Sequence, residues 1–173
     1  MVAARIRSAA ERDLPDLVRI YNHYITRSHV TFDTEPFSIE ERRPWFKGFS
    51  SPGPHRLLVA EVDVRTVGYA SSKEFRPKPA YQRSVETTIY LDQAFIGRGI
   101  GQALFAALLE ALEVEDSVHR AYAAIALPNR TSVALHQRFG FTLAGTFREV
   151  GFKFGRYWDV SWYEKAFSRL NAG

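Results

Sequence analysis

The middle of the chain carries a strand, a glycine-rich turn and a long helix in direct succession, and this unit constrains the fold more than any other segment. Side chains at 84–91 alternate between two surfaces, as in a strand whose faces meet different surroundings. One surface carries Val85, Thr87, Ile89 and Leu91, and the other carries Glu86, Thr88 and Tyr90. After the glycines at 97, 99 and 101, apolar residues with helical spacing continue to about Val114. A strand that leads through a turn into an amphipathic helix predicts an α/β fold.

The patterns on either side of this unit predict further strands and helices. Strands are expected at 4–9, 56–62, 66–75, 120–126, 142–150 and 157–165, and helices at 14–27, from 38 onward, and at 129–139. Asp13 is expected to cap the first helix, and Ser38 with Glu41 is typical of a capping box. No linker is long enough to separate domains, so residues 1–173 are expected to form a single α/β domain, a mixed sheet with helices on its faces.

The composition excludes several classes of protein. There is no cysteine among the 173 residues, which excludes a disulfide framework, a zinc–thiolate site and a cysteine nucleophile. No apolar run approaches the ~20 residues of a membrane span, and charged residues at 5–13 stand where a signal peptide needs an apolar stretch. We therefore expect a cytoplasmic protein without a membrane partner.

The net charge of +4 is mild, and the 23 lysines and arginines are scattered along the chain. Nucleic-acid binders usually gather their basic residues on one face or in one run, so no nucleic-acid partner is expected. Ordinary surface composition explains this charge, and a small acidic ligand is the alternative.

The turn Gly97-Arg98-Gly99-Ile100-Gly101-Gln102 has the features of an anion site. Glycines let backbone N–H groups come close to a ligand, and the positive end of a helix dipole follows directly. A P-loop would need Lys-Ser or Lys-Thr where Gln102-Ala103 stand, and a dinucleotide fingerprint would need glycine in place of Gln102. The turn predicts either a phosphate site of another kind or a glycine-rich turn without a ligand.

Two motifs and a set of shorter segments lie in the same order as in one known family. Gly97–Gly101 before a helix resembles the acetyl-CoA pyrophosphate loop of the GNAT superfamily of N-acetyltransferases, and Asn129–Phe141 resembles its second cofactor motif, N-x-x-S/A and a helix ending in G-F. The shorter segments resemble the phosphinothricin N-acetyltransferase group, which acetylates small amino-acid analogues such as phosphinothricin, methionine sulfoximine and methionine sulfone. They are Tyr21–Ile25, Thr31–Pro36, Ala80-Tyr81, Val85–Tyr90, Val150–Lys153 and Trp158–Val160. The resemblance runs from Ile6 to about Lys165.

The resemblance implies a GNAT-like single domain with a mixed, mostly antiparallel twisted sheet and helices on both faces. It also implies acetyl-CoA as co-substrate, no metal, a small amino-acid-like acceptor and a homodimer. The residues that it assigns to cofactor binding are Ile89, Leu91, Ile96, Gly97, Arg98, Gly99, Ile100, Gly101, Asn129 and Ser132. Ile96 departs from the superfamily, which usually has Gln or Arg at this position, so backbone amides are expected to carry most of the phosphate binding.

Glu86 is the candidate general base. Acyl transfer from a thioester needs a neutral amine, whereas an α-amino group with a pKa of ~8 is mostly protonated at pH 7. A carboxylate takes that proton directly or through water. The alternative is a structural carboxylate paired with Arg83 or another base, and the match to the group's Val-Glu-x-Thr-x-Tyr segment favours the base.

His136 stands where the superfamily usually has a tyrosine that protonates the leaving thiolate, and this replacement is typical of the phosphinothricin group. An imidazolium would protonate the thiolate, and a neutral ring would position the amine. The alternative is a partly buried structural histidine. Asn129 and Ser132 are expected to cap their helix and, by the resemblance, to hydrogen-bond the pantetheine arm as well.

Phe32, Lys78, Tyr81 and Tyr90 are the candidate acceptor residues, because aromatic side chains can wall a pocket and present a phenol. The alternative for each of them is a place in the core or on the surface. Lys78 would be the cation for a carboxylate, at a position where the group often has arginine with its bidentate fork. The segment Ser28–Phe37 is expected to roof the site, which favours a small acceptor over a protein or peptide amine. A non-catalytic CoA-binding module is a third interpretation, and Glu86 beside the glycine turn argues against it. The large aromatics Trp45, Phe46, Trp158 and Trp162 are assigned mainly to the core or a dimer contact.

Overall fold

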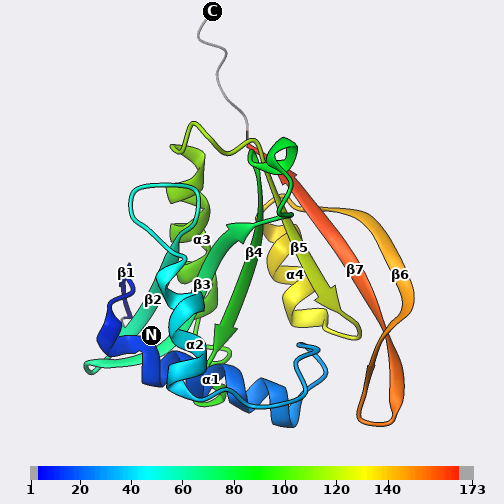
Figure 1. Cartoon of the computed structure of the whole chain (residues 1–173), viewed down its shortest axis with the longest axis horizontal. Helices are drawn as coiled ribbons and strands as arrows, with labels where there is room; N and C mark the ends of the chain where they lie inside the picture. Colours follow the sequence, from blue (N-terminus) through cyan, green and yellow to red (C-terminus); the bar gives the residue numbers. More distant parts are fainter. Residues whose placement is uncertain (1–3, 168–173) are drawn as a thin grey trace, which may run out of the picture.

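The computed structural model describes residues 4–167, which form one seven-stranded sheet flanked by four α-helices (Figure 1). The strands are β1 (Arg5–Ser8), β2 (Leu57–Val62), β3 (Arg65–Glu74), β4 (Ser84–Leu91), β5 (Arg120–Ala126), β6 (Thr142–Lys153) and β7 (Arg156–Ala166). The helices are α1 (Leu14–Arg27), α2 (Ile39–Lys47), α3 (Ile100–Glu113) and α4 (Arg130–Arg138). Short 3-10 turns η1 (Glu11–Asp13), η2 (Pro79–Tyr81) and η3 (Gln93–Phe95) lie between them.

The order of strands and helices is the predicted one, and only the 3-10 turns were not expected. The largest difference in length concerns β6, which was expected to end at Val150. It continues to Lys153 because its last three residues pair with the first three of β7, Arg156 to Trp158. The predicted single domain also includes residues 1–3 and 168–173, which lie outside the described residues.

The sheet is mixed and mostly antiparallel. Its spatial order is β1-β2-β3-β4-β5-β7-β6, and every neighbouring pair is antiparallel except β4 and β5. A parallel pair needs a crossover connection, and α3 lies in the connection between these two strands. The predicted fold class is therefore confirmed.

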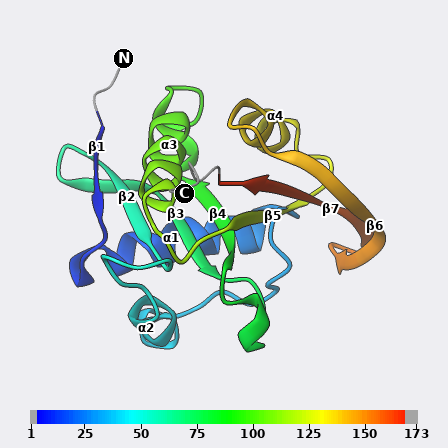
Figure 2. The same ribbon diagram turned by 90° about the horizontal axis from the view of Figure 1, so that it is seen from above.

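Helices cover both faces of the sheet, with α3 and α4 on one side and α1 and α2 on the other (Figure 2). The apolar stripe of α3 is its buried side, where Leu104 and Leu108 are completely inaccessible to solvent. On the opposite face, Leu17 and Ile20 of α1 pack with Tyr69 of β3 in a second buried cluster. The two clusters fix the helices on the sheet by burying apolar surface on both of its sides.

The strands β4 and β5 pair only where they begin. Their parallel register joins Ser84–Glu86 to Arg120–Tyr122, and no later pair forms between them among the described residues. Each strand is held on its other side, β4 by β3 as far as Leu91 and β5 by β7 as far as Ala126. Figure 1 shows the two strands spreading apart toward their carboxyl ends. The sheet is therefore open at its centre.

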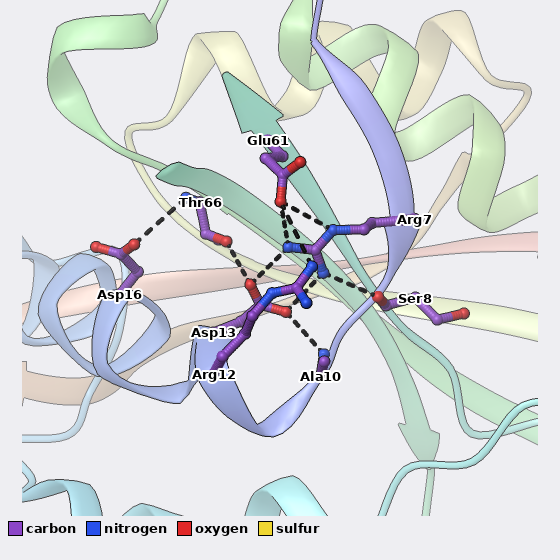
Figure 3. Close-up of polar contacts among 8 residues, drawn as sticks. All are labelled: Arg7, Ser8, Ala10, Arg12, Asp13, Asp16, Glu61 and Thr66. Carbon is purple, nitrogen blue, oxygen red and sulfur yellow. Dashed lines mark hydrogen bonds and ion pairs between the residues drawn. The ribbon is translucent and has the colours of Figure 1, made fainter. Parts of the chain in front are cut away.

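A buried ion cluster ties the amino-terminal segment to the sheet (Figure 3). Arg7 of β1 donates two hydrogen bonds to the Asp13 carboxylate, at 2.7 and 2.8 Å, and two to Glu61 of β2, at 2.5 and 3.0 Å. The Ala10 amide and the Thr66 hydroxyl of β3 donate to the same Asp13 carboxylate, at 2.7 and 2.8 Å. The cluster thus connects β1, β2, β3 and the start of α1.

Of the caps predicted for α1 and α2, only the one at α2 forms. The Glu41 amide donates to Ser38 Oγ at 3.2 Å and the Ser38 amide donates to the Glu41 carboxylate at 2.7 Å, which is the predicted capping box. The cap predicted for Asp13 is wrong. Asp13 occupies the N-cap position of α1, but its side chain makes no capping hydrogen bond because the ion cluster already engages both carboxylate oxygens.

The ion cluster lowers the pKa of Asp13 and yields a stability prediction. Burial alone would raise the pKa of this carboxyl, but hydrogen bonds from Arg7, Ala10 and Thr66 outweigh it and hold the pKa below its usual 3.8. Asp13→Asn is expected to lower the free energy of unfolding by about 2–4 kcal/mol at neutral pH, because the Arg7 guanidinium loses its closest charge partner.

A depressed folded-state pKa means that the ionised carboxyl stabilises the fold above the unfolded pKa of about 4 and loses this contribution as the pH falls. The stability difference between the parent protein and Asp13→Asn should therefore shrink from about pH 5 to about pH 3 in urea titrations followed by circular dichroism. Asp63→Asn, at an exposed turn, is the matched control and should change stability by less than about 0.5 kcal/mol. A difference that stays constant with pH would contradict the assignment.

Candidate active site

A cavity of about 970 Å³ fills the space that β4 and β5 leave open, and we call it the large cavity. Its walls come from Thr87–Leu91 of β4, Ala123–Ala126 of β5, the turn before α3 and the inner side of α4. A ligand that fills it meets the start of α3. It also meets the facing edges of β4 after Glu86 and of β5 after Tyr122, where the two strands no longer pair with each other.

The glycine-rich turn forms one end of the large cavity. Gly97 and Gly99 have φ angles of +79° and +81°, which residues with a Cβ rarely adopt. Gly101 packs so closely on β4 that a Cβ there would come 3.0 Å from Leu91 Cδ1. The first-turn amides of α3 have no acceptor within the helix and lie at its positive end. This geometry suits a phosphate.

Helix α4 supplies the facing wall. Asn129 Oδ1 accepts a hydrogen bond from the Ser132 amide at 3.1 Å, so Asn129 caps the helix as predicted. Nδ1 of His136 lies 2.8 Å from the Ser132 carbonyl oxygen. Since that oxygen only accepts, Nδ1 carries the proton of the neutral ring. The other ring nitrogen, Nε2, is buried and has no hydrogen-bond partner among the described residues.

Burial determines the charge of His136. The residue is 3% exposed, and its ring packs against Phe105 and Phe141. Desolvation lowers the pKa of the imidazole below its usual 6.5, and the hydrogen bond to the Ser132 carbonyl offsets this only in part. The ring is therefore neutral at pH 7, with Nε2 as an acceptor.

A second cavity, of about 220 Å³, lies on the sheet face that α1 and α2 cover, and we call it the small cavity. It joins the large cavity at the gap in the sheet, where five residues line both. These are Val30, Thr88, Tyr90, Ala124 and Ala126. Glu86 of β4 and Lys73 of β3, which are opposite each other in the strand register, line only the small cavity. Two ligands, one in each cavity, would therefore meet at the gap.

Glu86 lines the small cavity together with Thr88 and Tyr90, on the strand face that the alternation predicts. Within residues 4–167 its carboxylate forms no ion pair. Arg83, the partner expected if Glu86 were structural, donates instead to the Asp116 carbonyl at 3.1 Å. The expected structural ion pair is thus not formed, and the carboxylate faces the cavity with Lys73 opposite it in the strand register but not paired with it.

Part of the segment 28–37, which was expected to roof the site, borders the small cavity, and β6 holds it in place. Thr31 and Phe32 line the cavity. The Phe32 ring lies against Gly151, where a Cβ would come within 2.2 Å of it, so only glycine leaves room. Lys153 is 5% exposed and donates from Nζ to the Thr31 carbonyl at 2.7 Å. Gly151 and Lys153 therefore position the roof rather than meet a ligand themselves.

Tyr21 and Tyr90 are two of the tyrosines that present protonated phenols to the small cavity. The Tyr21 hydroxyl lies 2.7 Å from the Thr31 hydroxyl and donates to Asp33. Burial, together with the hydrogen bond to Asp33, raises the pKa of Tyr21 to about 12. Burial and the neighbouring Tyr21 also raise the pKa of Tyr90. Both phenols are neutral hydrogen-bond donors at pH 7.

Most of the predicted site residues lie at these two cavities. The large cavity is lined by Ile89, Leu91, Ile96, Gly97, Gly99, Gly101, Asn129, Ser132 and His136, the small one by Phe32 and Glu86, and both by Tyr90. The side chains of Arg98 and Ile100 line neither cavity. Arg98 lies over the Phe95 ring, and Ile100 is buried in the core beneath the turn.

Lys78 and Tyr81 lie away from both cavities. Tyr81 ends the turn η2 that follows β3, and Lys78 is its N-cap. Lys78 is exposed, and Tyr81 is 43% exposed and packs edge-on against Phe75. The described chain therefore does not bring the predicted cation to its small cavity.

Most residues of the small cavity were not predicted as site residues, and Arg42, Trp45 and Lys73 are among them. Arg42 precedes Trp45 by three positions, which places both on one side of α2, and this spacing is the signal that the sequence offers. Trp45 was assigned to the core or a dimer contact, and it does pack beside Tyr69 in addition to lining the cavity. Of the other large aromatics, Phe46 packs on the same cluster, Trp158 stacks on His29 and Trp162 lies edge-on to Phe75.

Residues 4–167 hold neither an evident metal site nor a membrane-spanning helix. No group of three or more His, Cys, Asp or Glu side chains in this range is placed to hold a metal ion. None of its helices is both long and apolar enough to cross a membrane. The cytoplasmic location and the absence of membrane and nucleic-acid partners stay predictions.

Comparisons with known proteins agree with this geometry. Residues 6–162 match the family model of the acetyltransferase (GNAT) domain. The chain is 54% identical over 164 residues to phosphinothricin N-acetyltransferase of Streptomyces coelicolor, across 93% of this chain and 95% of that protein. It is 31% identical over 163 residues to the L-methionine sulfoximine/L-methionine sulfone acetyltransferase of Pseudomonas aeruginosa, across 94% of each. A crystal structure of a phosphinothricin acetyltransferase from Sinorhizobium meliloti in complex with acetyl-CoA matches with a TM-score of 0.92 at 30% identity, covering 100% of this chain and 92% of that one.

Proposed function

The chain belongs to the GNAT family and is an acetyl-CoA-dependent N-acetyltransferase, and on that premise we propose that it acetylates the free α-amine of small amino-acid analogues. Phosphinothricin, methionine sulfoximine and methionine sulfone are the proposed acceptors, because the similar enzymes are named for this chemistry. One observation carries the proposal. A small roofed cavity that holds an unpaired carboxylate joins a larger cavity at the gap between β4 and β5.

The large cavity suits acetyl-CoA. The amides at the start of α3, with Gly97 and Gly99 before them, suit a pyrophosphate. Beyond Glu86, the backbone groups of β4 that face β5 have no strand partner and are available to the amides of a pantetheine arm. Asn129 and Ser132 border the same space from α4. When bound there, acetyl-CoA supplies the acetyl thioester.

Gly99→Val tests this placement of the cofactor. A β-branched residue is strained at a φ of +81° and obstructs the approach of a phosphate to the first-turn amides, so the dissociation constant for acetyl-CoA should rise tenfold or more. Isothermal titration calorimetry measures it.

Gly155→Val is the matched control for the strain, because Gly155 has a φ of +73° in the turn between β6 and β7 and lines neither cavity. That variant should lose stability but keep its acetyl-CoA affinity. An unchanged affinity in folded Gly99→Val protein would remove the glycine turn from cofactor binding.

We propose Glu86 as the general base. An α-ammonium group with a pKa of ~8 is mostly protonated at pH 7, and only the neutral amine attacks a thioester. The Glu86 carboxylate, which no basic side chain of residues 4–167 engages, takes that proton directly or through a water molecule. The amine then forms a bond to the thioester carbonyl carbon and the C–S bond breaks. The nitrogen loses its second proton and the departing CoA thiolate gains one, so the products are the amide and free CoA.

We assign His136 a positioning role instead of that of the acid for the leaving thiolate. The Nδ1 proton is held by the Ser132 carbonyl, and burial keeps the ring neutral, so Nε2 has no proton to give at pH 7. The buried Nε2 offers an acceptor at the wall of the large cavity. A protonated Nε2 at pH 7 in ¹⁵N nuclear magnetic resonance spectra would contradict this assignment.

Glu86→Gln tests the base directly. Glutamine keeps the size and polarity but not the basicity, so kcat/KM should fall by about 10²–10⁴-fold while acetyl-CoA affinity stays nearly unchanged. The activity should recover in part as the pH rises, because free amine then forms without help. The measurement is kcat/KM against pH, beside the melting temperature.

Glu74→Gln is the control, since Glu74 is an exposed carboxylate at the end of β3 that lines neither cavity. Its activity should match that of the parent. If folded Glu86→Gln loses less than about threefold in kcat/KM, Glu86 is not the base.

The size of the small cavity predicts which amines the enzyme accepts. A space of about 220 Å³ beside the segment 28–37 suits one amino acid better than a polypeptide. Thiol release should therefore be faster with phosphinothricin, methionine sulfoximine and methionine sulfone than with peptides that present a lysine or a free N-terminus. Higher kcat/KM values for peptides would favour a protein acceptor, and acetyl-CoA binding without turnover on any amine would favour a non-catalytic module.

We also propose a homodimer in which a second copy covers β6. This strand is the edge of the sheet, and the apolar side chains along its hairpin with β7 are each more than half exposed. They are Leu143, Phe147, Val150, Phe152, Phe154 and Tyr157. Proteins usually cover long apolar edges of this kind, and the resemblance to the phosphinothricin group implies a dimer. A monomeric mass in light scattering at micromolar concentration would contradict it.

A further inference from the structure

Arg42 of α2 is a half-buried cation that no acidic side chain neutralises. Its guanidinium lies 4.1 Å from the ring centre of Trp45, 4.6 Å from that of Tyr21 and 5.0 Å from that of Phe37. Within residues 4–167 it forms no ion pair. The next residue, Arg43, is paired with Glu40 and with Glu11.

Aromatic rings stabilise the faces of a guanidinium but do not satisfy its N–H groups, which lie in the plane of the group. The phenols around Arg42 are neutral. Burial raises the pKa values of Tyr21, Tyr69 and Tyr90, and the positive charge of Arg42, together with its hydrogen bond to the Tyr69 hydroxyl, lowers them only in part. The cation is therefore near three phenols, and none of them carries a compensating negative charge at pH 7.

Arg42 lines the small cavity, and so does Glu86. The cavity thus combines a carboxylate suited to an ammonium group with a guanidinium suited to an oxyanion. Lys73 of β3, which lies opposite Glu86 in the strand register, adds a second cation to the cavity. Lys78, which the sequence suggested for the oxyanion, lines neither cavity.

We propose that Arg42 binds an oxygen-bearing group of the acceptor and so helps to determine which amines are acetylated. The proposal rests on the proposed function, since it names the residue that recognises the acceptor within that same cavity. Two parts of the acceptor share the required chemistry: the α-carboxylate, and the phosphinate, sulfoximine or sulfone oxygens at the end of its side chain. The bidentate geometry of arginine fits each.

A purely structural role is the competing explanation, in which the stacked guanidinium only holds α2 against α1. Arg42→Met removes the charge and keeps much of the length, and Arg42→Lys keeps the charge without the planar fork. Arg43→Met is the matched control, because Arg43 is the adjacent surface arginine of α2 and lines neither cavity.

The test is steady-state kinetics at saturating acetyl-CoA with L-methionine sulfone, its carboxamide and L-methionine, beside melting temperatures and acetyl-CoA dissociation constants. For a poor acceptor, the competitive inhibition constant replaces KM. Arg42→Met should raise KM for methionine sulfone tenfold or more, because a hydrogen bond to a charged group is lost. The kcat should stay within about threefold of that of the parent, and the affinity for acetyl-CoA should not change. Arg42→Lys should recover part of this loss, and Arg43→Met should behave as the parent.

The two poorer acceptors identify the group that Arg42 binds. If Arg42 binds the α-carboxylate, Arg42→Met should hardly change KM for the carboxamide but should raise KM for methionine as much as for methionine sulfone. If Arg42 binds the sulfone oxygens, Arg42→Met should raise KM for the carboxamide in full and hardly change KM for methionine. A change in KM below threefold for all three acceptors, or an activity loss that only follows the loss of folded protein, overturns the role of Arg42. A parent enzyme that acetylates peptides and none of these acceptors overturns the proposed function, and this inference with it.

Discussion

The gap between β4 and β5 is the constraint on which the site depends. Parallel strands normally exchange hydrogen bonds along their length, but these two pair only over Ser84–Glu86 and Arg120–Tyr122. Their antiparallel ladders to β3 and β7 hold each strand in its diverging path. Backbone groups without partners are costly where water is excluded, and a ligand that carries amides offsets that cost. The opening in the sheet and the ligand site are therefore the same feature.

Charges are arranged differently in the scaffold and in the site. In the scaffold, Arg7 and Arg12 pair with the carboxylates of Asp13 and Glu61. In the small cavity, Glu86 and Arg42 have no ion-pair partner among residues 4–167. A desolvated charge without a partner lowers stability, so a fold retains it where a ligand supplies the opposite charge. An acceptor with an ammonium group and an oxyanion complements both side chains.

The roof of the small cavity depends on contacts between distant parts of the chain. Lys153 donates to the carbonyl of Thr31, 122 positions away, and Phe32 occupies the space that a side chain at position 151 would need. These contacts fix one wall of the cavity of about 220 Å³, which Val160 of β7 also lines directly, so the hairpin of β6 and β7 shapes the space offered to a ligand. Only the paired sheet brings the two segments together.

The sequence by itself determined the features that depend on backbone periodicity or on neighbours a few residues away. Alternation along 84–91 was enough to place Glu86 on the face of Thr88 and Tyr90, and Ser38 with Glu41 was enough to begin a helix. Tertiary structure decided the rest. Asp13 has the local chemistry of a helix cap, but β1 brings a guanidinium whose charge-assisted hydrogen bonds are stronger than a cap. Arg42 lines the small cavity and Lys78 does not. Their positions depend on how whole helices and strands pack against one another, and no short stretch of sequence encodes that packing.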